Sequence, residues 1–354
     1  MKILILNRRD IANPAGGGAE IYTHEIARGL AGKYGCEVVI FSSRFGGGAT
    51  EDVIDGVRYV RKGNEVTVHL WGLFYAAKNR RRFDRIIDEF NGSGFFTFFL
   101  PDSILLIHQM YKEFWFRELG VAGAIPYLLE PLLLRLYRKR LAITVSESTK
   151  EDLRARGFGG VRIVMNAITD RSNGEVEKDA DPTIVFLGRL KSTKQPEDAI
   201  EIFRKVKQRV SAARLWMIGA GPLERVLRKR AEGLTDVIFF GWVKDKEKMA
   251  LLQRSHVLVV PSVREGFGIN VIEAASAGCP AVGYDVPGLR DSIRHGETGY
   301  LVDSADDAAR RIIELLTDSA TFELMSRNCR DYAKGFDWGI RVDEFWAVIR
   351  DAKK

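Results

Sequence analysis

Short apolar runs alternate along almost the whole chain with longer segments whose apolar residues recur at helical spacing. This alternation is typical of a parallel sheet built from βαβ units. The pattern disappears over residues 169–181, where Asp, Lys, Glu, Asn, Gly and Pro dominate, and it then starts again. We therefore expect two consecutive α/β domains with doubly wound sheets, at residues 1–168 and 182–335, joined by a linker at 169–181.

The first domain contains five clear strand candidates and several helix candidates. Strands are expected at 3–6, 37–41, 57–60, 104–107 and 141–145, and helices near 19–33, 73–90 and 127–139. Ser148 with Glu151 fits a capping box and predicts a helix start there. In the second domain, strands are expected at 183–187, 214–218, 237–240, 256–260 and 281–284. Ligands of such sheets bind at the carboxyl ends of the strands, so two facing halves predict a site in an interdomain cleft.

Composition places the chain among ordinary globular proteins, with 46% apolar and 29% charged residues. Its cysteines, Cys36, Cys279 and Cys329, lie far apart without a CxxC pair, which argues against a disulfide framework or a Cys-rich zinc site. The first residues resemble a strand and not a signal peptide. Apolar stretches at 95–107 and 119–134 are interrupted by charges, so no membrane span is expected. A cytoplasmic protein fits best.

The formal net charge of +7 lies mostly in the first half of the chain. Residues 1–168 hold 24 Lys and Arg against 18 Asp and Glu, a net of +6, and the remaining residues hold 30 against 29, a net of +1. This asymmetry fits an anionic partner of the first domain or an ordinary solvated basic face.

Glycines between the first strand and the first helix form the first candidate site. Gly16, Gly17 and Gly18 allow a ligand to approach the backbone, and the first-turn amides of the following helix suit an anion. Ile21 stands where a dinucleotide-binding fingerprint requires a third glycine, and the Gly-Lys-Ser/Thr ending of a P-loop is missing. A simple tight turn is the alternative.

Two loops of the second domain are further candidates. Gly188 ends a strand, and Arg189 and Lys194 then offer two cations to phosphate oxygens, although basic loop residues are commonly just solvated. The second loop follows the strand at 256–260: Glu265 precedes a Gly266-Phe267-Gly268 turn that opens a helix carrying Glu273. Amides at the helix start could bind hydroxyl or phosphate oxygens. The Glu273 carboxylate could accept hydrogen bonds from a ribose diol, or simply lie on the surface.

These motifs, in this order, resemble the retaining GT-B glycosyltransferases of family GT4. The resemblance rests on Glu265…Glu273, on residues 277–280, 287–289 and 296–302, and on the earlier loops, and it covers nearly the whole chain. It implies the GT-B fold, with two Rossmann-like domains: an acceptor side at 1–168, a nucleotide-sugar side at 182–335, and a helical segment at 336–354 that packs on the first domain. Gln195 and Ala167 replace glycines that are common in the family.

The resemblance also implies roles for single residues. Arg189 and Lys194 would bind the diphosphate of the sugar donor, Glu273 its ribose, and Glu265 with residues 266–268 the sugar. Gly17 and Gly18 would face the diphosphate from the first domain. His108, which ends the strand at 104–107, would lie near the sugar and the acceptor, and without the resemblance it would pass for a structural histidine.

The expected activity is transfer of a hexose from a nucleoside diphosphate sugar to a lipid-linked or glycan acceptor, with retention of configuration and without a metal or other cofactor. Other GT-B activities, such as an epimerase or a hydrolase, or nucleotide-sugar binding without transfer, remain alternatives. Ile21 argues against a nicotinamide oxidoreductase, and no RNP-like, zinc-finger or helix-turn-helix pattern supports nucleic-acid binding. Basic and aromatic residues near 78–82, 111–116 and 127–140 predict peripheral contact with the inner face of an anionic membrane.

Overall fold

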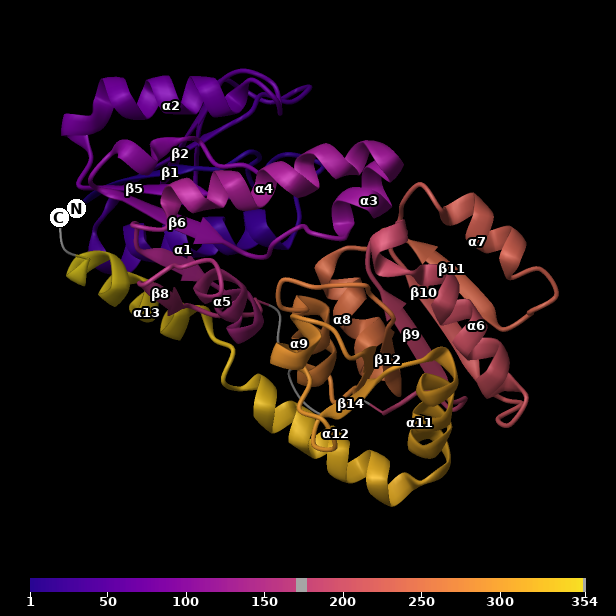
Figure 1. The fold of residues 1–354 in the computed structure, drawn as a ribbon. Coiled ribbons are helices and arrows are strands. Elements are labelled where there is room, and N and C mark those ends of the chain that lie inside the picture. Colours follow the sequence, from indigo (N-terminus) through magenta and orange to yellow (C-terminus); the bar gives the residue numbers. More distant parts are fainter. Residues whose placement is uncertain (170–176, 353–354) are drawn as a thin grey trace. The chain divides into compact units, whose positions relative to one another are not determined.

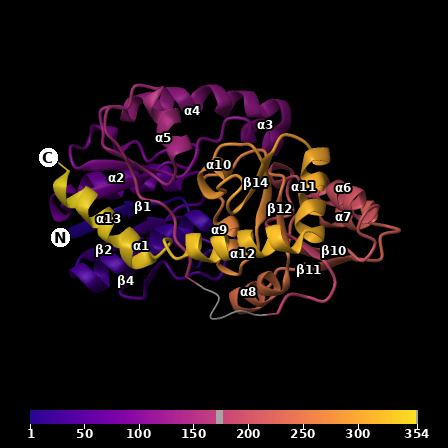
Figure 2. The same cartoon turned by 90° about the horizontal axis from the view of Figure 1, so that it is seen from below.

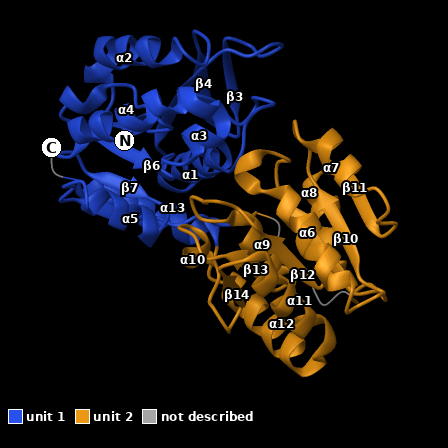
Figure 3. Cartoon of the chain, turned by 45° about the vertical axis from the view of Figure 1, so that its right-hand side comes forward, with its two compact units in different colours: residues 1–167, 337–354 blue, residues 168–336 orange. Residues whose placement is uncertain are grey.

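The structure is a computed structural model that describes residues 1–169 and 177–352. It divides into two compact units: unit 1 contains residues 1–167 and 337–354, and unit 2 contains residues 168–336 (Figure 3). Residues 170–176 of the expected linker lie outside the described residues.

Unit 1 is built on an eight-stranded sheet with the order β3-β4-β2-β1-β5-β6-β7-β8. β3 and β4 pair antiparallel, and the other neighbouring strands pair in parallel. The strands are β1 (Lys2–Leu6), β2 (Glu37–Ser42), β3 (Glu51–Ile54), β4 (Val57–Arg61), β5 (Arg85–Glu89), β6 (Ser103–Ile107), β7 (Ala142–Thr144) and β8 (Val161–Ile163). β1, β5 and β6 are almost wholly buried, as expected for central strands covered on both faces.

Helices cover both faces of this sheet (Figure 1). They are α1 (Gly18–Tyr34), α2 (Val68–Asn79), η1 (Arg80–Arg82), η2 (Thr97–Phe99), α3 (Phe114–Leu119), η3 (Gly120–Gly123), α4 (Ala124–Tyr137), α5 (Glu147–Arg154) and the C-terminal α13 (Trp338–Asp351).

The C-terminal helix α13 packs along α1 in unit 1, and the two lie side by side in both Figure 1 and Figure 2. A Cβ on Gly29 would lie 2.3 Å from Val342 Cγ2, so only glycine allows this close approach. Tyr34 stacks on Trp346 with ring centroids 4.7 Å apart. The last helix therefore belongs to the core of unit 1.

The helix expected over residues 73–90 is wrong in its second half. α2 ends at Asn79, and residues 85–89 form the central strand β5. The strand is difficult to recognise from the sequence because it contains charged residues. Their side chains can be buried because each has a specific partner far along the chain. Arg85 Nε donates to Ile349 O at 2.8 Å, and Asp88 accepts from Tyr137 Oη at 2.7 Å.

The capping box expected at Ser148 is also wrong. α5 begins at Glu147, and Ser146 is its N-cap, with Oγ accepting from the Thr149 amide at 3.2 Å. Ser146 already satisfies this first-turn amide, which moves the helix start two residues upstream.

Unit 2 is built on a six-stranded parallel sheet with the order β11-β10-β9-β12-β13-β14. Its strands are β9 (Thr183–Leu187), β10 (Arg214–Ile218), β11 (Val237–Gly241), β12 (Val257–Val260), β13 (Ala281–Tyr284) and β14 (Gly299–Val302). Its helices are η4 (Ser192–Lys194), α6 (Pro196–Lys207), α7 (Glu224–Arg230), α8 (Asp245–Arg254), α9 (Ile269–Ser276), α10 (Leu289–Ser292), α11 (Ala305–Thr317) and α12 (Ser319–Ala333).

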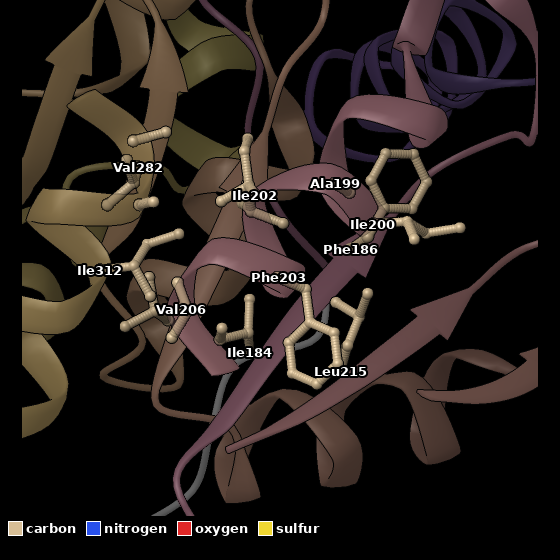
Figure 4. Packing of buried hydrophobic residues seen from close by; sticks show 14 of the residues in the cluster. Ile184, Phe186, Ala199, Ile200, Ile202, Phe203, Val206, Leu215, Val282 and Ile312 are labelled. Carbon is tan, nitrogen blue, oxygen red and sulfur yellow. The ribbon is translucent and has the colours of Figure 1, made fainter. Parts of the chain in front are cut away.

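The core of unit 2 forms where α6 packs on β9 and β10 (Figure 4). The helix contributes apolar residues at helical spacing, including Ile200, Phe203 and Val206, each fully buried. They contact Ile184 and Leu215 of the sheet. Each such burial stabilises the fold by about 1.5–3 kcal/mol, so this packing holds β9 firmly below the loop that follows it.

Candidate functional site

The candidate site of unit 2 lies at the carboxyl edge of its sheet, beside the point where the strand order reverses. β9 is followed by β10 and β11 on one side, whereas β12, β13 and β14 extend on the other. The loops after the neighbouring strands β9 and β12 therefore lead in opposite directions along the sheet. Open α/β sheets bind ligands in the crevice between two such loops. Both sequence-predicted loops of this unit fall at this position.

The loop after β9 is held closely against a glycine turn. A Cβ on Gly219 would lie 2.1 Å from Gly188 O, and one on Gly221 would lie 2.4 Å from Leu190 O. The Leu190 amide donates to Ala220 O at 3.0 Å. Only glycines permit this contact, which fixes the backbone from which the neighbouring Arg189 extends as an exposed side chain.

Lys194 and Glu265 bring the two loops together. Lys194 Nζ donates to Glu265 Oε2 at 2.6 Å, and Ser262 Oγ donates to Glu265 Oε1 at 2.7 Å. The Val263 amide donates to Thr193 O at 3.2 Å, so the backbones are joined as well. Glu265 is 9% exposed. The result is a nearly buried carboxylate paired with one lysine at the edge of the sheet.

The turn after Glu265 opens helix α9. Gly268 is its N-cap and has φ 84°, a conformation that favours glycine, and a Cβ there would lie 2.8 Å from Ser292 Oγ. Asn270 Nδ2 donates to Leu187 O at 2.9 Å, which ties the start of the helix to the end of β9. Gly266, Phe267 and Gly268 therefore form the last part of the loop after β12, next to the tie between α9 and β9, and Phe267 is buried at 2% exposure.

Glu273 lies in the middle of α9 and pairs with a lysine that the sequence analysis does not identify. Lys248 Nζ of α8 donates to Glu273 Oε1 at 2.7 Å and to Asp245 Oδ1 at 2.8 Å. Burial alone would lower the pKa of Lys248, but the two carboxylates outweigh it and raise this pKa, so the ammonium stays charged. The contact crosses 25 residues between two helices, and no local sequence pattern reveals it.

The glycine loop of unit 1 leads into α1 as expected, but its first amide is already engaged. Gly17 is the N-cap, and its amide donates to Glu20 Oε2 at 2.7 Å. Gly18 is the first residue of the helix. The Glu20 carboxylate therefore already accepts from one of the amides at the positive end of the helix, which we expected to face an anion.

His108 follows β6 next to a buried carboxylate that the sequence analysis also misses. Its Nε2 lies 3.2 Å from Glu89 Oε1, an ion-pair distance, although the angle there is not that of a hydrogen bond. Glu89 ends β5 at 1% exposure and accepts from Thr23 Oγ1 at 2.7 Å and from Asn91 Nδ2 at 3.2 Å. β1 and β5 flank the reversal point of this sheet. Glu89 was not identified from the sequence because residues 73–90 were expected to form a helix.

The expected site residues are thus divided between the two units. Unit 2 contains Arg189, Lys194, Glu265, residues 266–268 and Glu273, and unit 1 contains Gly17, Gly18 and His108. In residues 1–169 and 177–352, no group of three or more His, Cys, Asp or Glu side chains could hold a metal ion.

Two family models match the chain. The model of Glycosyltransferase Family 4 matches residues 16–171, and that of Glycosyl transferases group 1 matches residues 168–336. The sulfoquinovosyl transferase SQD2 of Arabidopsis thaliana is 31% identical over 188 residues, covering 50% of this chain and 35% of that protein. A phosphatidyl-myo-inositol mannosyltransferase of Mycobacterium leprae is 30% identical over 171 residues, covering 47% of this chain and 46% of that protein. The chain therefore spans less than half the length of these curated relatives.

Solved structures show the same fold. WaaG, a glycosyltransferase involved in lipopolysaccharide biosynthesis, matches with a TM-score of 0.76 and 17% identity, over 99% of this chain and 100% of that one. The two α/β units are thus those of the GT-B fold.

Proposed function

We propose that this chain, which belongs to the family 4 type of glycosyltransferases by its two matching family models, transfers a hexose from a nucleoside diphosphate sugar to an acceptor with retention of anomeric configuration. The observation that carries this proposal is the joined pair of loops at the reversal point of the unit 2 sheet. There Lys194 holds positive charge on the Glu265 carboxylate just before α9, and the exposed Arg189 lies in the same loop as Lys194.

The chemical demand on unit 2 comes from the leaving group. The bond from the anomeric carbon to the diphosphate oxygen breaks, and a bond from that carbon to the acceptor oxygen forms. Negative charge grows on the diphosphate, and cations that stabilise it more in the transition state than in the ground state raise the rate. Arg189 and Lys194 would do this, while Glu265 and residues 266–268 orient the sugar and Glu273 binds the ribose.

Retention would follow from attack on the same face that the diphosphate leaves, with a phosphate oxygen taking the acceptor proton. Glu265 would orient the sugar in this scheme, with its carboxylate held in place because its oxygens accept from Lys194 and Ser262. His108, with Glu89 beside it, would lie near the acceptor hydroxyl and the sugar, and the Gly17–Gly18 segment near the diphosphate.

We further propose that transfer needs no divalent metal and no other cofactor. Arg189 and Lys194 can supply the charge that a metal would give. Asp179 and Asp181 form the only Asp-x-Asp sequence, and both carboxylates are paired with arginines, Arg254 and Arg214. Activity should survive EDTA. Complete loss of activity in EDTA that Mg²⁺ or Mn²⁺ restores would overturn this.

The acceptor is proposed to be a lipid-linked saccharide or another glycan, reached by a peripheral enzyme at the cytoplasmic face of a membrane. The names of the relatives support this class, since the Mycobacterium leprae protein is a phosphatidyl-myo-inositol mannosyltransferase and WaaG takes part in lipopolysaccharide biosynthesis.

The first experiment is a thermal-shift panel of UDP-, GDP- and ADP-sugars. A ligand at about 100 times its Kd stabilises the native state by about 2.7 kcal/mol, so the matching nucleotide sugar should raise Tm. The Lys194→Ala variant should lose this shift. Lys205→Ala should keep it, because Lys205 pairs with Asp306 at the surface of the same unit.

The second experiment separates transfer from the alternatives. Nucleoside diphosphate release that depends on an added acceptor and yields a glycosylated product supports transfer. Free sugar indicates a hydrolase, an altered nucleotide sugar indicates an epimerase, and binding without turnover indicates a nucleotide-sugar-binding protein.

A further inference from the structure

The outward face of helix α4 is apolar, which reverses the usual pattern of a surface helix. Five aliphatic side chains on α4 are exposed at helical spacing along one face, at 47–66% exposure: Ile125, Leu128, Leu129, Leu132 and Leu136. Phe116, Leu119 and Val121 extend this exposed apolar surface through α3 and η3. A contiguous surface of this kind marks an interaction site.

The inward face of α4 fixes this orientation. Leu134 and Tyr137 are buried in the core beneath the helix. Glu130, at 1% exposure, accepts from the amides of Tyr111 and Lys112 at 2.8 and 3.0 Å. These contacts hold the helix by the side that carries Glu130, Leu134 and Tyr137, so the opposite side, with the exposed aliphatic residues, faces outward.

Helix α2 lies on the same face of the unit 1 sheet. Leu6 packs in the core under α2, and Leu105 packs in the core under α4. Leu6 pairs with Asp88, which pairs with Leu105, so the two leucines occupy one row and point to one side of the sheet. On α2, Leu70, Trp71 and Phe74 are exposed at 41–66%.

Basic residues follow both helices at the same edge of the sheet. In parallel βαβ units each crossover helix runs opposite to the strands, so α2 and α4 end at the same edge. Arg80, Arg81 and Arg82 are exposed there after α2, and Arg138 and Lys139 are exposed after α4. Between Phe114 and Arg140 the acidic residues are Glu118 and the buried Glu130. The apolar surface is thus bordered by positive charge.

We propose that the outer faces of α3, η3, α4 and α2 form a docking surface for a bilayer that contains anionic lipid. The segment Phe114–Tyr137 is long and apolar enough to cross a membrane by length and composition, with 17% of its apolar window buried. Its fastening through Glu130 and Tyr137 argues that it lies in the plane of the interface, with aliphatic side chains among acyl chains and arginines at the head groups. The inference extends the proposed function by naming the surface that would bring this enzyme to a lipid-linked acceptor.

Vesicle binding without any sugar substrate tests the surface separately from the activity. The full chain should co-sediment with vesicles of phosphatidylcholine and 30 mol% phosphatidylglycerol, and much less with phosphatidylcholine alone or at high salt. Leu128→Ser with Leu132→Ser should weaken binding at least tenfold, and Arg138→Glu with Lys139→Glu should abolish the preference for anionic vesicles. The matched control is Val226→Ser with Leu324→Ser, which removes two exposed aliphatic side chains from unit 2 and should bind like the wild type.

Other outcomes would overturn the inference. Absence of binding to anionic vesicles at low salt would do so, as would equal loss in the control pair. If sedimentation shows a dimer that the Leu128→Ser and Leu132→Ser changes dissociate, the surface contacts a second copy of this chain instead. Circular dichroism and the thermal shift with the nucleotide sugar verify that each variant is folded. Docking that fails while sugar transfer persists would leave the proposed function intact.

Discussion

Lys194 Nζ contacts both oxygens of Glu265, and the contact joins the loop after β9 to the loop after β12. The two side chains are 23% and 10% exposed, so their charges are only partly screened by solvent. A nucleotide sugar that binds here must satisfy both groups, because a diphosphate competes with Glu265 for the lysine. In the proposed donor site the pair would hold the lysine in place before a diphosphate binds, which lowers the cost of ordering it.

The first prediction is that Lys194→Ala lowers kcat about 10²–10³-fold, the usual effect of removing one group that stabilises transition-state charge. Lys205→Ala is the control. Steady-state kinetics should also be measured for Glu265→Ala and for the double variant Lys194→Ala with Glu265→Ala. Because the two residues are in contact, the activation free energy should rise less in the double variant than the sum of its rises in the two single variants. Wild-type kinetics in folded Lys194→Ala would refute the diphosphate assignment.

The second prediction concerns the Lys248–Glu273 pair. Lys248→Met removes the ammonium that holds the Glu273 carboxylate, and we expect weaker binding of the nucleoside diphosphate, about tenfold for ~1.4 kcal/mol, with little change in kcat. Calorimetric titration with the nucleotide alone measures it. Asp245→Asn is the control, since it removes the other, exposed partner of Lys248 and leaves the contact with Glu273. Equal affinities for all three proteins would show that the contact of Lys248 with Glu273 plays no part in nucleotide binding.

Loops at strand ends were predictable from the sequence because their signals are local. Gly188 and Arg189 come directly after an apolar run, and Glu265 with its neighbouring glycines lies within a few residues of another. The ends of parallel strands meet at one edge of the sheet. Lys248 and Glu89 were not predictable in this way. Lys248 meets Glu273, 25 residues away, through helix packing, and Glu89 meets His108, 19 residues away, through strand pairing. A periodic pattern in the sequence does not indicate such contacts.

The missed strand β5 shows the same limit at the level of secondary structure. Arg85, Asp88 and Glu89 give residues 85–89 the composition of a surface helix, yet the side chains of Arg85 and Asp88 hydrogen bond inside the unit. A strand whose buried charged side chains are hydrogen bonded is not recognised by a pattern that expects a central strand to be apolar. For the leucines of α4 the sequence shows their place beside basic residues, but only the packing shows which of them face outward.

The third prediction is a loss of stability in mild acid that depends on His256. Burial and the nearby charge of Lys178 lower its pKa from 6.5 to about 4, against a smaller opposing effect of Asp179. Its Nδ1 accepts from the Thr183 amide at 3.1 Å, and a proton on Nδ1 would break this bond. Between pH 6.5 and 4 the unfolded chain binds more protons at this residue, so the free energy of unfolding falls as the pH falls.

This contribution amounts to about 3 kcal/mol, since each pKa unit is worth ~1.4 kcal/mol. Urea unfolding at pH 7, 6, 5 and 4 measures it. His256→Asn keeps an acceptor oxygen for Thr183 without a titratable ring and should flatten this part of the pH dependence. An unchanged slope in the variant would mean that other groups cause the acid sensitivity.

The last prediction is that Glu89 positions His108 for the reaction. Glu89 Oε1 lies 3.2 Å from His108 Nε2, and Tyr22 packs edge-on against the imidazole with centroids 5.1 Å apart. Glu89→Gln keeps the size of the side chain and an acceptor for Thr23 but removes the charge beside the ring. We expect kcat to fall on the order of 10²-fold, the size of effect that a displaced proton-transfer or hydrogen-bonding group commonly has, with the KM for the sugar donor unchanged. Thr23→Val is the matched control, because it removes a hydrogen bond to Glu89 at 2.7 Å and leaves the carboxylate beside His108. If both variants lose activity equally and in step with Tm, Glu89 serves only the fold of unit 1, and His108 acts without it.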